Sequence, residues 1–164
     1  MGDRVKQTLF AILEPDLPGA RVLDLFAGSG ALGIEALSRG AAGAVFVERE
    51  PGACSVITAN LARTRLAGPA VRVVRADAFT WLTGIAAVEA GPFDLAVADP
   101  PYDDPALLLR ALESLGPLLA PRARVVAKHF WRDAPPPVVG LLASERERRF
   151  GETALTFYRR QETR

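Results

Sequence analysis

The sequence predicts an α/β fold in which helices cover both faces of a mostly parallel sheet, with an antiparallel hairpin at the C-terminal end. Short apolar segments alternate with longer amphipathic ones over most of the chain, which is typical of β-α-β units. Residues 141–148 and 154–160 are interpreted as segments of alternating polarity around a glycine-containing turn at residues 150–152, which indicates paired antiparallel strands. Because 164 residues match the size of one compact domain, we expect a single domain over residues 1–164.

The elements follow from the apolar pattern, taken in chain order. Buried strands are predicted for residues 21–26, 44–48, 71–76, 93–98 and 124–130. Helices are predicted between them for residues 31–39, 51–65, 79–88 and 105–119. Pro51 and Pro105 fit the first helical turn, where a missing N–H costs nothing, and Gly40 stands where a helix is expected to end. A proline-rich loop at residues 134–137 precedes the hairpin, whose strands are predicted at residues 141–148 and 154–160.

The composition excludes several functional classes. Cys54 and His129 are the only residues of their kinds, so no intrachain disulfide can form and no metal site built from His and Cys is expected. No segment has the length and apolar character of a membrane span or a signal peptide, which favours a cytoplasmic protein, and we expect a monomer. The net charge of +1 does not by itself indicate a nucleic-acid binder, although arginines are spaced so that local patches could form.

A glycine-rich segment follows the first predicted strand. Residues 28–33 match the dinucleotide-binding pattern G-x-G-x-x-G, and Glu48 follows at the distance of an acid that binds a ribose. A nicotinamide-dependent dehydrogenase is therefore one interpretation. Against it, Asp24 is an acid inside the first strand, and Phe26-Ala27 lengthens the path from that acid to the first glycine.

An S-adenosylmethionine site gives each of these acids a role. Asp24 could meet the ammonium of the methionine moiety, Glu48 both ribose hydroxyls, and Asp77-Ala78 the amino edge of adenine, while Phe79 could cover the adenine face. Acids at the carboxyl ends of consecutive strands lie where an open α/β sheet binds its ligand. The alternative is that Asp24 and Asp77 only cap the helices that follow them.

The motif Asp99-Pro100-Pro101-Tyr102 follows the fourth predicted strand. The carboxylate of Asp99 and the carbonyl of Pro100 can accept the two hydrogens of an exocyclic base amino group and direct its lone pair toward a methyl sulfonium. Two prolines fix the loop, and Tyr102 offers a ring on which an extruded base could stack. The motif therefore predicts methyl transfer to an amino group of a nucleobase.

Taken together, the segments 24–41 and 150–158, with Glu48 and the Asp99 motif, resemble the bacterial 16S rRNA guanine-N2 methyltransferase family. The resemblance covers nearly the whole chain. It implies a Rossmann-like class I methyltransferase fold with seven strands, S-adenosylmethionine as the methyl donor, and ribosomal RNA or the small ribosomal subunit as the partner. The implied catalytic residues are Asp99, Pro100, Pro101 and Tyr102. The implied cofactor-binding residues are Asp24, Phe26, Ala27, Gly28, Ser29, Gly30, Leu32, Glu48, Arg49, Asp77, Ala78 and Phe79.

One departure from the family concerns the start of the chain. Family members usually begin with a basic, glycine-containing segment, whereas residues 1–10 resemble only the helix that follows it. Either the recorded start of the chain is too late, or the chain has been trimmed, or this member lacks part of the RNA-docking surface. Two further interpretations remain open: a catalytically weak cofactor- or RNA-binding protein in ribosome assembly, and an amino methyltransferase of DNA.

Overall fold

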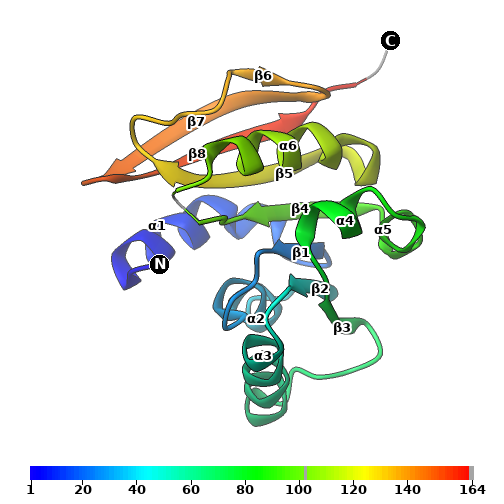
Figure 1. Ribbon diagram of the computed structural model, residues 1–164. Helices are drawn as coiled ribbons and strands as arrows, with labels where there is room; N and C mark the ends of the chain where they lie inside the picture. The colour runs from blue at the N-terminus through cyan, green and yellow to red at the C-terminus, as the bar shows by residue number, and fades with distance from the viewer. Residues whose placement is uncertain (102, 163–164) are drawn as a thin grey trace.

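The computed structural model describes residues 1–101 and 103–162. Within these residues, eight strands form one sheet in the order β3-β2-β1-β4-β5-β8-β7-β6 (Figure 1). The strands are β1 (Arg21–Leu25), β2 (Gly43–Glu48), β3 (Val71–Arg75), β4 (Phe93–Ala98), β5 (Leu119–Phe130), β6 (Val138–Val139), β7 (Leu142–Phe150) and β8 (Thr153–Arg160). Strands β1 to β5 are parallel to one another, and β8, β7 and β6 continue the sheet in antiparallel pairs.

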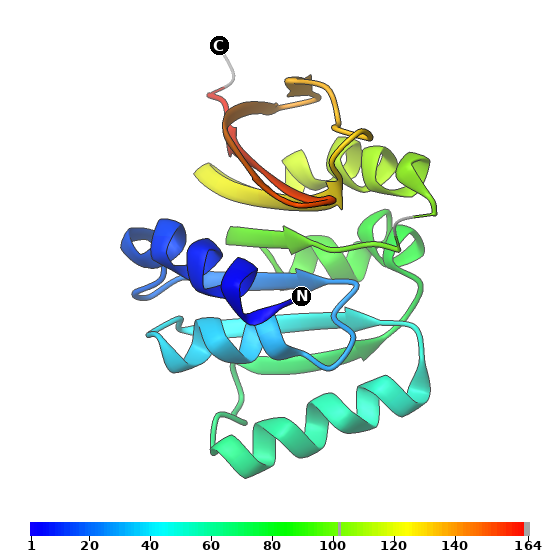
Figure 2. The same ribbon diagram turned by 90° about the vertical axis from the view of Figure 1, so that its left-hand side faces the viewer.

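Helices cover both faces of the sheet, as the apolar periodicity predicts (Figure 2). On one face, α1 (Asp3–Leu13), α2 (Ala31–Ser38) and α3 (Pro51–Thr64) pack on the sheet through a core layer that includes Phe46 and Phe157. On the other face, α4 (Ala78–Leu82), α5 (Ile85–Ala90) and α6 (Pro105–Leu115) enclose a second layer that includes Trp81 and Tyr158. In the described part of the chain, no helix is long and apolar enough to span a membrane.

The predicted fold class is confirmed, with corrections to individual elements. The resemblance implies seven strands, and the eighth is the two-residue β6, which is too short to produce a detectable polarity pattern. The helix predicted at residues 79–88 is two helices, because Thr83 ends α4 and Gly84 adopts an extended conformation before α5. The helix predicted at residues 105–119 ends at Leu115, where Gly116–Leu118 form a 3₁₀ turn and β5 begins directly afterwards.

The carboxyl ends of the parallel strands meet at one edge of the sheet, and the turn between β7 and β8 lies at the same edge (Figure 2). The pairing explains why: Phe130, the last residue of β5, lies opposite Thr153, the first residue of β8. The glycine-rich loop, the Asp99 motif and the hairpin turn are therefore brought to one edge, from three distant parts of the sequence.

Candidate active site

Four charged residues share one face of the sheet at this carboxyl edge. Asp24 is in β1, Glu48 ends β2, Asp99 follows β4, and Lys128 is near the end of β5. Side chains alternate between the two faces of a strand. The residue two positions before each of them belongs to the core layer beneath α1, α2 and α3: Val22, Phe46, Val97 and Val126. The strand pattern alone thus directs all four charged side chains toward the same face.

Asp24 is the buried member of the group, with 1% of its surface exposed. Its Oδ2 accepts a hydrogen bond from the Gly33 N–H in the first turn of α2 at 3.0 Å. Burial raises the pKa of the Asp24 carboxyl to about 8; the Gly33 N–H opposes this rise, and the negative charges of Asp99 and Glu48 add to it. Asp24 therefore bonds to the helix that follows it, as the capping interpretation requires, and it lies behind the glycine-rich loop.

The glycine-rich loop has the tight backbone that the sequence predicts. Phe26, Gly28 and Gly30 have positive φ angles of 62°, 58° and 80°. A positive φ is strained for a residue as bulky as phenylalanine, at a cost of about 1–3 kcal/mol. A Cβ atom at Gly28 would meet nothing within 4 Å, so this part of the loop borders open space. At Gly33, in contrast, a Cβ atom would stand 2.3 Å from the Phe46 ring, so this glycine is required by packing.

A cavity of about 570 Å³ opens next to this loop, a size typical of small-molecule sites. Glu48 contributes to its wall, and its Oε1 and Oε2 accept hydrogen bonds from the N–H groups of Gly28 (2.9 Å) and Glu50 (2.8 Å). Each carboxylate oxygen keeps a second lone pair for a ligand hydroxyl. The cavity is lined by Phe26, Val47, Glu48, Arg49, Glu50, Ala76, Asp77, Ala78, Asp99, Pro100, Pro101, Asp103 and Leu107.

Of the three residues predicted to contact adenine, two line the cavity and Phe79 does not. Asp77 and Ala78 line the cavity, and Asp77 also caps α4 by accepting from the Thr80 N–H at 3.0 Å. That hydrogen bond holds the pKa of Asp77 below its ordinary value. The ring of Phe79 instead lies beneath the Arg110 guanidinium of α6, at 3.9 Å from the ring centroid, and is not among the residues that line the cavity.

The other predicted cofactor residues have different surroundings: Arg49 lines the cavity, Ala27 and Ser29 are held by hydrogen bonds of the loop backbone, and Leu32 lies in the core. Arg49 lines the cavity and forms an exposed ion pair with Glu50 at 3.3 Å. The Ala27 N–H donates to the Val47 carbonyl at 3.0 Å, and the Ser29 carbonyl accepts from Asn60 at 3.2 Å. Leu32 belongs to the core layer beneath α2, so its side chain packs away from the cavity.

The Asp99-Pro100-Pro101 turn forms another wall of the cavity. The Oδ1 atom of Asp99 lies 3.1 Å from the Lys128 Nζ, with exposed side-chain fractions of 22% and 14% for Asp99 and Lys128. This ion pair fixes the acid at the mouth of the cavity, and within residues 1–101 and 103–162 no side chain or N–H donates to Asp99 Oδ2. Tyr102, the last residue of the predicted motif, lies outside the described residues.

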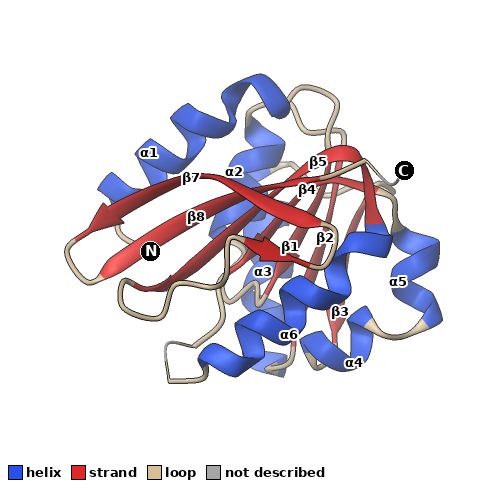
Figure 3. Ribbon diagram, turned by 90° about the horizontal axis from the view of Figure 1, so that it is seen from above, coloured by secondary structure: helices blue, strands red, loops and turns tan. Residues whose placement is uncertain are grey.

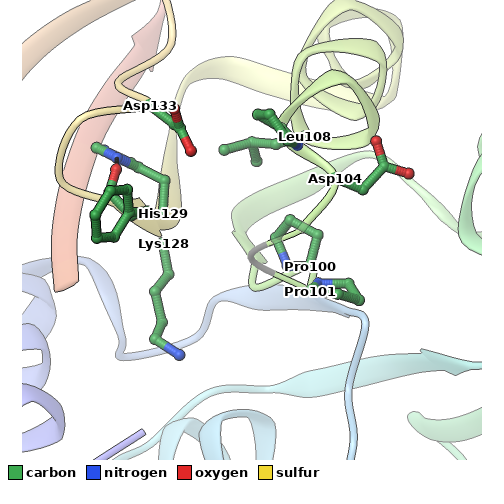
Figure 4. Close-up of a pocket in the computed structure, with 9 residues that line it drawn as sticks. Pro100, Pro101, Asp104, Leu108, Lys128, His129 and Asp133 are labelled. Atoms are coloured by element: carbon green, nitrogen blue, oxygen red, sulfur yellow. Dashed lines mark hydrogen bonds between the residues drawn. The ribbon is translucent and has the colours of Figure 1, made fainter. Parts of the chain in front are cut away.

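Behind the turn is a second, small hollow of about 10 Å³, enough for roughly one water molecule. Figure 4 shows it between the two prolines, α6 and the end of β5. Pro100 and Pro101 therefore separate the large cavity from this hollow. His129, on the hollow's wall, uses both ring nitrogens within the protein, at 2.7 Å from the Phe130 carbonyl and from Thr156 Oγ1. These two contacts give His129 a structural role at the end of β5, where it links β5 to β8.

Lys128 is the site residue that the sequence prediction missed. A charged residue directly after the apolar run Val125-Val126-Ala127 was the available signal, because such a residue in a buried strand requires a partner. Among the described residues, no three histidine, cysteine, aspartate or glutamate side chains are grouped so that they could hold a metal ion.

Comparison with known proteins shows which proteins the whole chain resembles. A family model described as "Conserved hypothetical protein 95" matches residues 1–159. The "Ribosomal RNA small subunit methyltransferase D" of Escherichia coli K12 is 38% identical over 161 residues, which cover 97% of this chain and 78% of that protein. YlbH of Bacillus subtilis, named as a candidate rRNA methyltransferase, is 37% identical over 97% of this chain and 86% of its own length. The solved structure of the candidate methyltransferase YhhF of Escherichia coli superposes with a TM-score of 0.87 at 34% identity, covering 98% of this chain and 87% of that one.

Proposed function

The chain belongs to the family described as Conserved hypothetical protein 95, and we propose that it transfers a methyl group from S-adenosylmethionine to the 2-amino group of a guanine in 16S rRNA. The names of the relatives support the coarser part of this proposal, because they describe methyltransferases of ribosomal RNA and of the small subunit. The choice of the guanine 2-amino group rests on the resemblance of the motifs and on the chemistry of the Asp99 turn.

The cavity fits the proposed cofactor. S-adenosylmethionine supplies a methyl group already activated on a sulfonium, so the protein's task is binding and in-line positioning. In our proposal Glu48 binds the ribose hydroxyls through its remaining lone pairs, and Asp77 and Ala78 bind the adenine edge. In our proposal Asp24, behind the loop, is neutral in the protein without cofactor and ionises when the ammonium group of the cofactor binds, so that its charge then compensates that group.

The Asp99 turn fits the proposed acceptor. An exocyclic amino group is a poor nucleophile because its lone pair is delocalised into the ring. The Oδ2 of Asp99 and the Pro100 carbonyl can accept its two hydrogens, which turns the lone pair toward the donor and stabilises the positive charge that develops on nitrogen. Lys128 holds Oδ1 of Asp99 and so fixes the orientation of the acceptor pair.

The observation that carries the proposal is that the turn proposed to bind the acceptor amino group lines the same cavity as the residues proposed to bind the methyl donor. Asp99, Pro100 and Pro101 form a wall of the same cavity as Glu48, Asp77 and Ala78. An acid that receives an amino group at this wall is adjacent to the cavity in which the donor would be bound. The nicotinamide interpretation gives no role to this arrangement.

A transfer assay tests the proposal. The protein is incubated with S-adenosylmethionine labelled in its methyl group and, in separate reactions, with a 16S rRNA transcript, small ribosomal subunits lacking the modification, and duplex DNA. We expect label in the rRNA of one or both ribosomal substrates and none in DNA. Label in DNA alone would favour the DNA methyltransferase alternative. Binding of S-adenosylhomocysteine without transfer to any substrate would favour the weak binding protein.

A further inference from the structure

The tip of the hairpin projects beyond the helices at the carboxyl edge of the sheet (Figure 3). Strand β7 pairs with β8, and Arg149 lies opposite Ala154 near the turn. Alternation places Ala154 on the same face as Thr156 and Tyr158, which is the α6 face of the sheet. Arg149 therefore points to the α6 side, at a place beyond the end of α6.

Trp131 follows β5 on the same side of the sheet and is held at the hairpin turn. Its backbone N–H donates to the Glu152 carbonyl at 2.9 Å. The Arg149 guanidinium lies over its ring, 3.7 Å from the centroid, and the Arg132 guanidinium lies 4.8 Å from the same centroid. These three residues, Trp131, Arg132 and Arg149, form what we call the Trp131 cluster.

Arg149 is fixed in two ways at once. Its plane is supported by the Trp131 ring, and its Nε–H donates to the Gly151 carbonyl at 2.8 Å. Within the described part of the chain, no residue accepts a hydrogen bond from its two Nη groups. An exposed guanidinium that is held flat and keeps its donors available presents a face for base stacking and an edge for phosphate.

The cluster is continuous with the catalytic turn. Phe130 and Asp133, which bracket Trp131 and Arg132, line the small hollow behind Pro100 and Pro101 (Figure 4). If a base of the RNA is inserted at Asp99, the nucleotides next to it in the strand would pass along this edge of the sheet. The cluster thus lies on the opposite side of the Asp99 turn from the cofactor cavity.

From this geometry we infer that the Trp131 cluster is a docking platform for unpaired RNA, on which a nucleotide flanking the target guanine stacks and a phosphate is bound by Arg149. The inference rests on the proposed function for the identity of its partner. The local charge indicates whether stacking or charge neutralisation contributes more to RNA affinity. Residues 131–133 and 146–152 carry four arginines and three acids, so the local net charge is small. Stacking on planar groups therefore contributes more than charge neutralisation, and the salt dependence of this contribution is shallow.

The test compares RNA affinity in variants of this cluster with a matched arginine elsewhere. Binding of a 16S rRNA transcript and of small ribosomal subunits lacking the modification is measured for the natural protein and for Trp131→Ala, Arg149→Ala and Arg149→Lys, at several salt concentrations. Arg72→Ala is the control, because Arg72 is an exposed arginine on β3, the strand at the opposite edge of the sheet. Affinity for S-adenosylhomocysteine reports an intact cofactor cavity in each variant.

We expect Trp131→Ala and Arg149→Ala to weaken RNA binding roughly 5- to 100-fold, the scale of one lost stacking contact, with cofactor affinity unchanged. Arg149→Lys keeps the charge but not the plane, so it should lose most of the same affinity. The salt slope should change by less than about one, since at most one phosphate contact is removed. If Trp131→Ala does not fold, the two variants of the exposed Arg149 still decide the matter.

The outcomes separate this inference from the proposed function. If the natural protein methylates 16S rRNA and all cluster variants bind RNA like Arg72→Ala, the docking inference is overturned and the proposed function stands. If the variants lose RNA binding but the natural protein methylates no RNA, the platform stands and the proposed function fails. A natural protein that binds neither the transcript nor the unmodified small subunit would overturn both.

Discussion

Replacing Asp24 with asparagine should change how the stability of the protein depends on pH. Asp24 is buried, and its pKa rises from 3.8 to about 8 in the folded protein. Because the folded pKa exceeds the unfolded one, the contribution of this group to stability is fully present below pH 3.8 and is lost as the pH rises toward 8. Asparagine keeps the acceptor for the Gly33 N–H but cannot ionise.

The size of the effect follows from the two pKa values. Between them, the folded state holds a proton that the unfolded state has released, so the free energy of unfolding falls by about 1.4 kcal/mol per pH unit. From pH 5 to pH 7 this amounts to roughly 2.7 kcal/mol from Asp24 alone. The total free energy of unfolding of a typical domain is about 5–15 kcal/mol, so a loss of this size is a large part of it.

Urea unfolding of the natural protein and of Asp24→Asn at pH 5, 6 and 7 measures this difference. All other titrating groups are common to the two proteins and cancel in the comparison. Relative to Asp24→Asn, the natural protein should lose about 2–3 kcal/mol of unfolding free energy over this range. Parallel stability profiles for the two proteins would refute the conclusion that the Asp24 carboxyl is neutral in the folded protein at pH 7.

Other substitutions test separate parts of the site. Glu48→Ala should weaken binding of S-adenosylhomocysteine by roughly 1–3 kcal/mol, measured by calorimetry, and unchanged affinity would rule out the ribose assignment. Asp99→Ala should retain cofactor binding but lower turnover about a hundredfold or more, and near-normal methylation would contradict the amino-group mechanism. Lys128→Met should lower kcat about tenfold by releasing Asp99, with partial recovery in Lys128→Arg; equal kcat in all three proteins would show that the ion pair does not position the acid. Gly33→Ala should lower the unfolding free energy by about 1–3 kcal/mol because the new methyl group would collide with Phe46, and an unchanged melting temperature would contradict that packing argument.

Much of the fold could be predicted because its signals are local. The parallel strands are apolar runs bounded by polar residues, and the predicted strand at residues 93–98 matches β4 at both ends. The hairpin turn was visible at Gly151, which has a positive φ of 61°. The predicted alternation of polarity is not observed in the strands themselves, because β7 is exposed over most of its length and β8 is buried over most of its length. Helix boundaries were less accessible: Gly84 interrupts an apolar pattern whose periodicity continues across it, and only the backbone conformation reveals the break.

In the candidate site, too, the residues with a local sequence signal could be predicted, and the contacts that depend on strand register could not. The acids Asp24, Glu48 and Asp99 could be predicted because each stands at the carboxyl end of a strand, where this type of sheet binds ligands. The ion pair of Lys128 with Asp99 depends on the register between β4 and β5, which pairs Ala98 with Ala127 and which no local pattern encodes. In the same way, the Trp131 cluster joins residues 18 positions apart through the pairing of β5, β8 and β7.

The central claim concerns which atom receives the methyl group. The most direct measurement is to methylate ribosomal RNA with labelled S-adenosylmethionine, digest the product to nucleosides, and identify the labelled nucleoside by chromatography and mass spectrometry. Our account predicts that the label is recovered as N2-methylguanosine, at a single position of 16S rRNA. Label recovered in a methylated adenosine or cytidine, or on a ring nitrogen of guanosine, would contradict it.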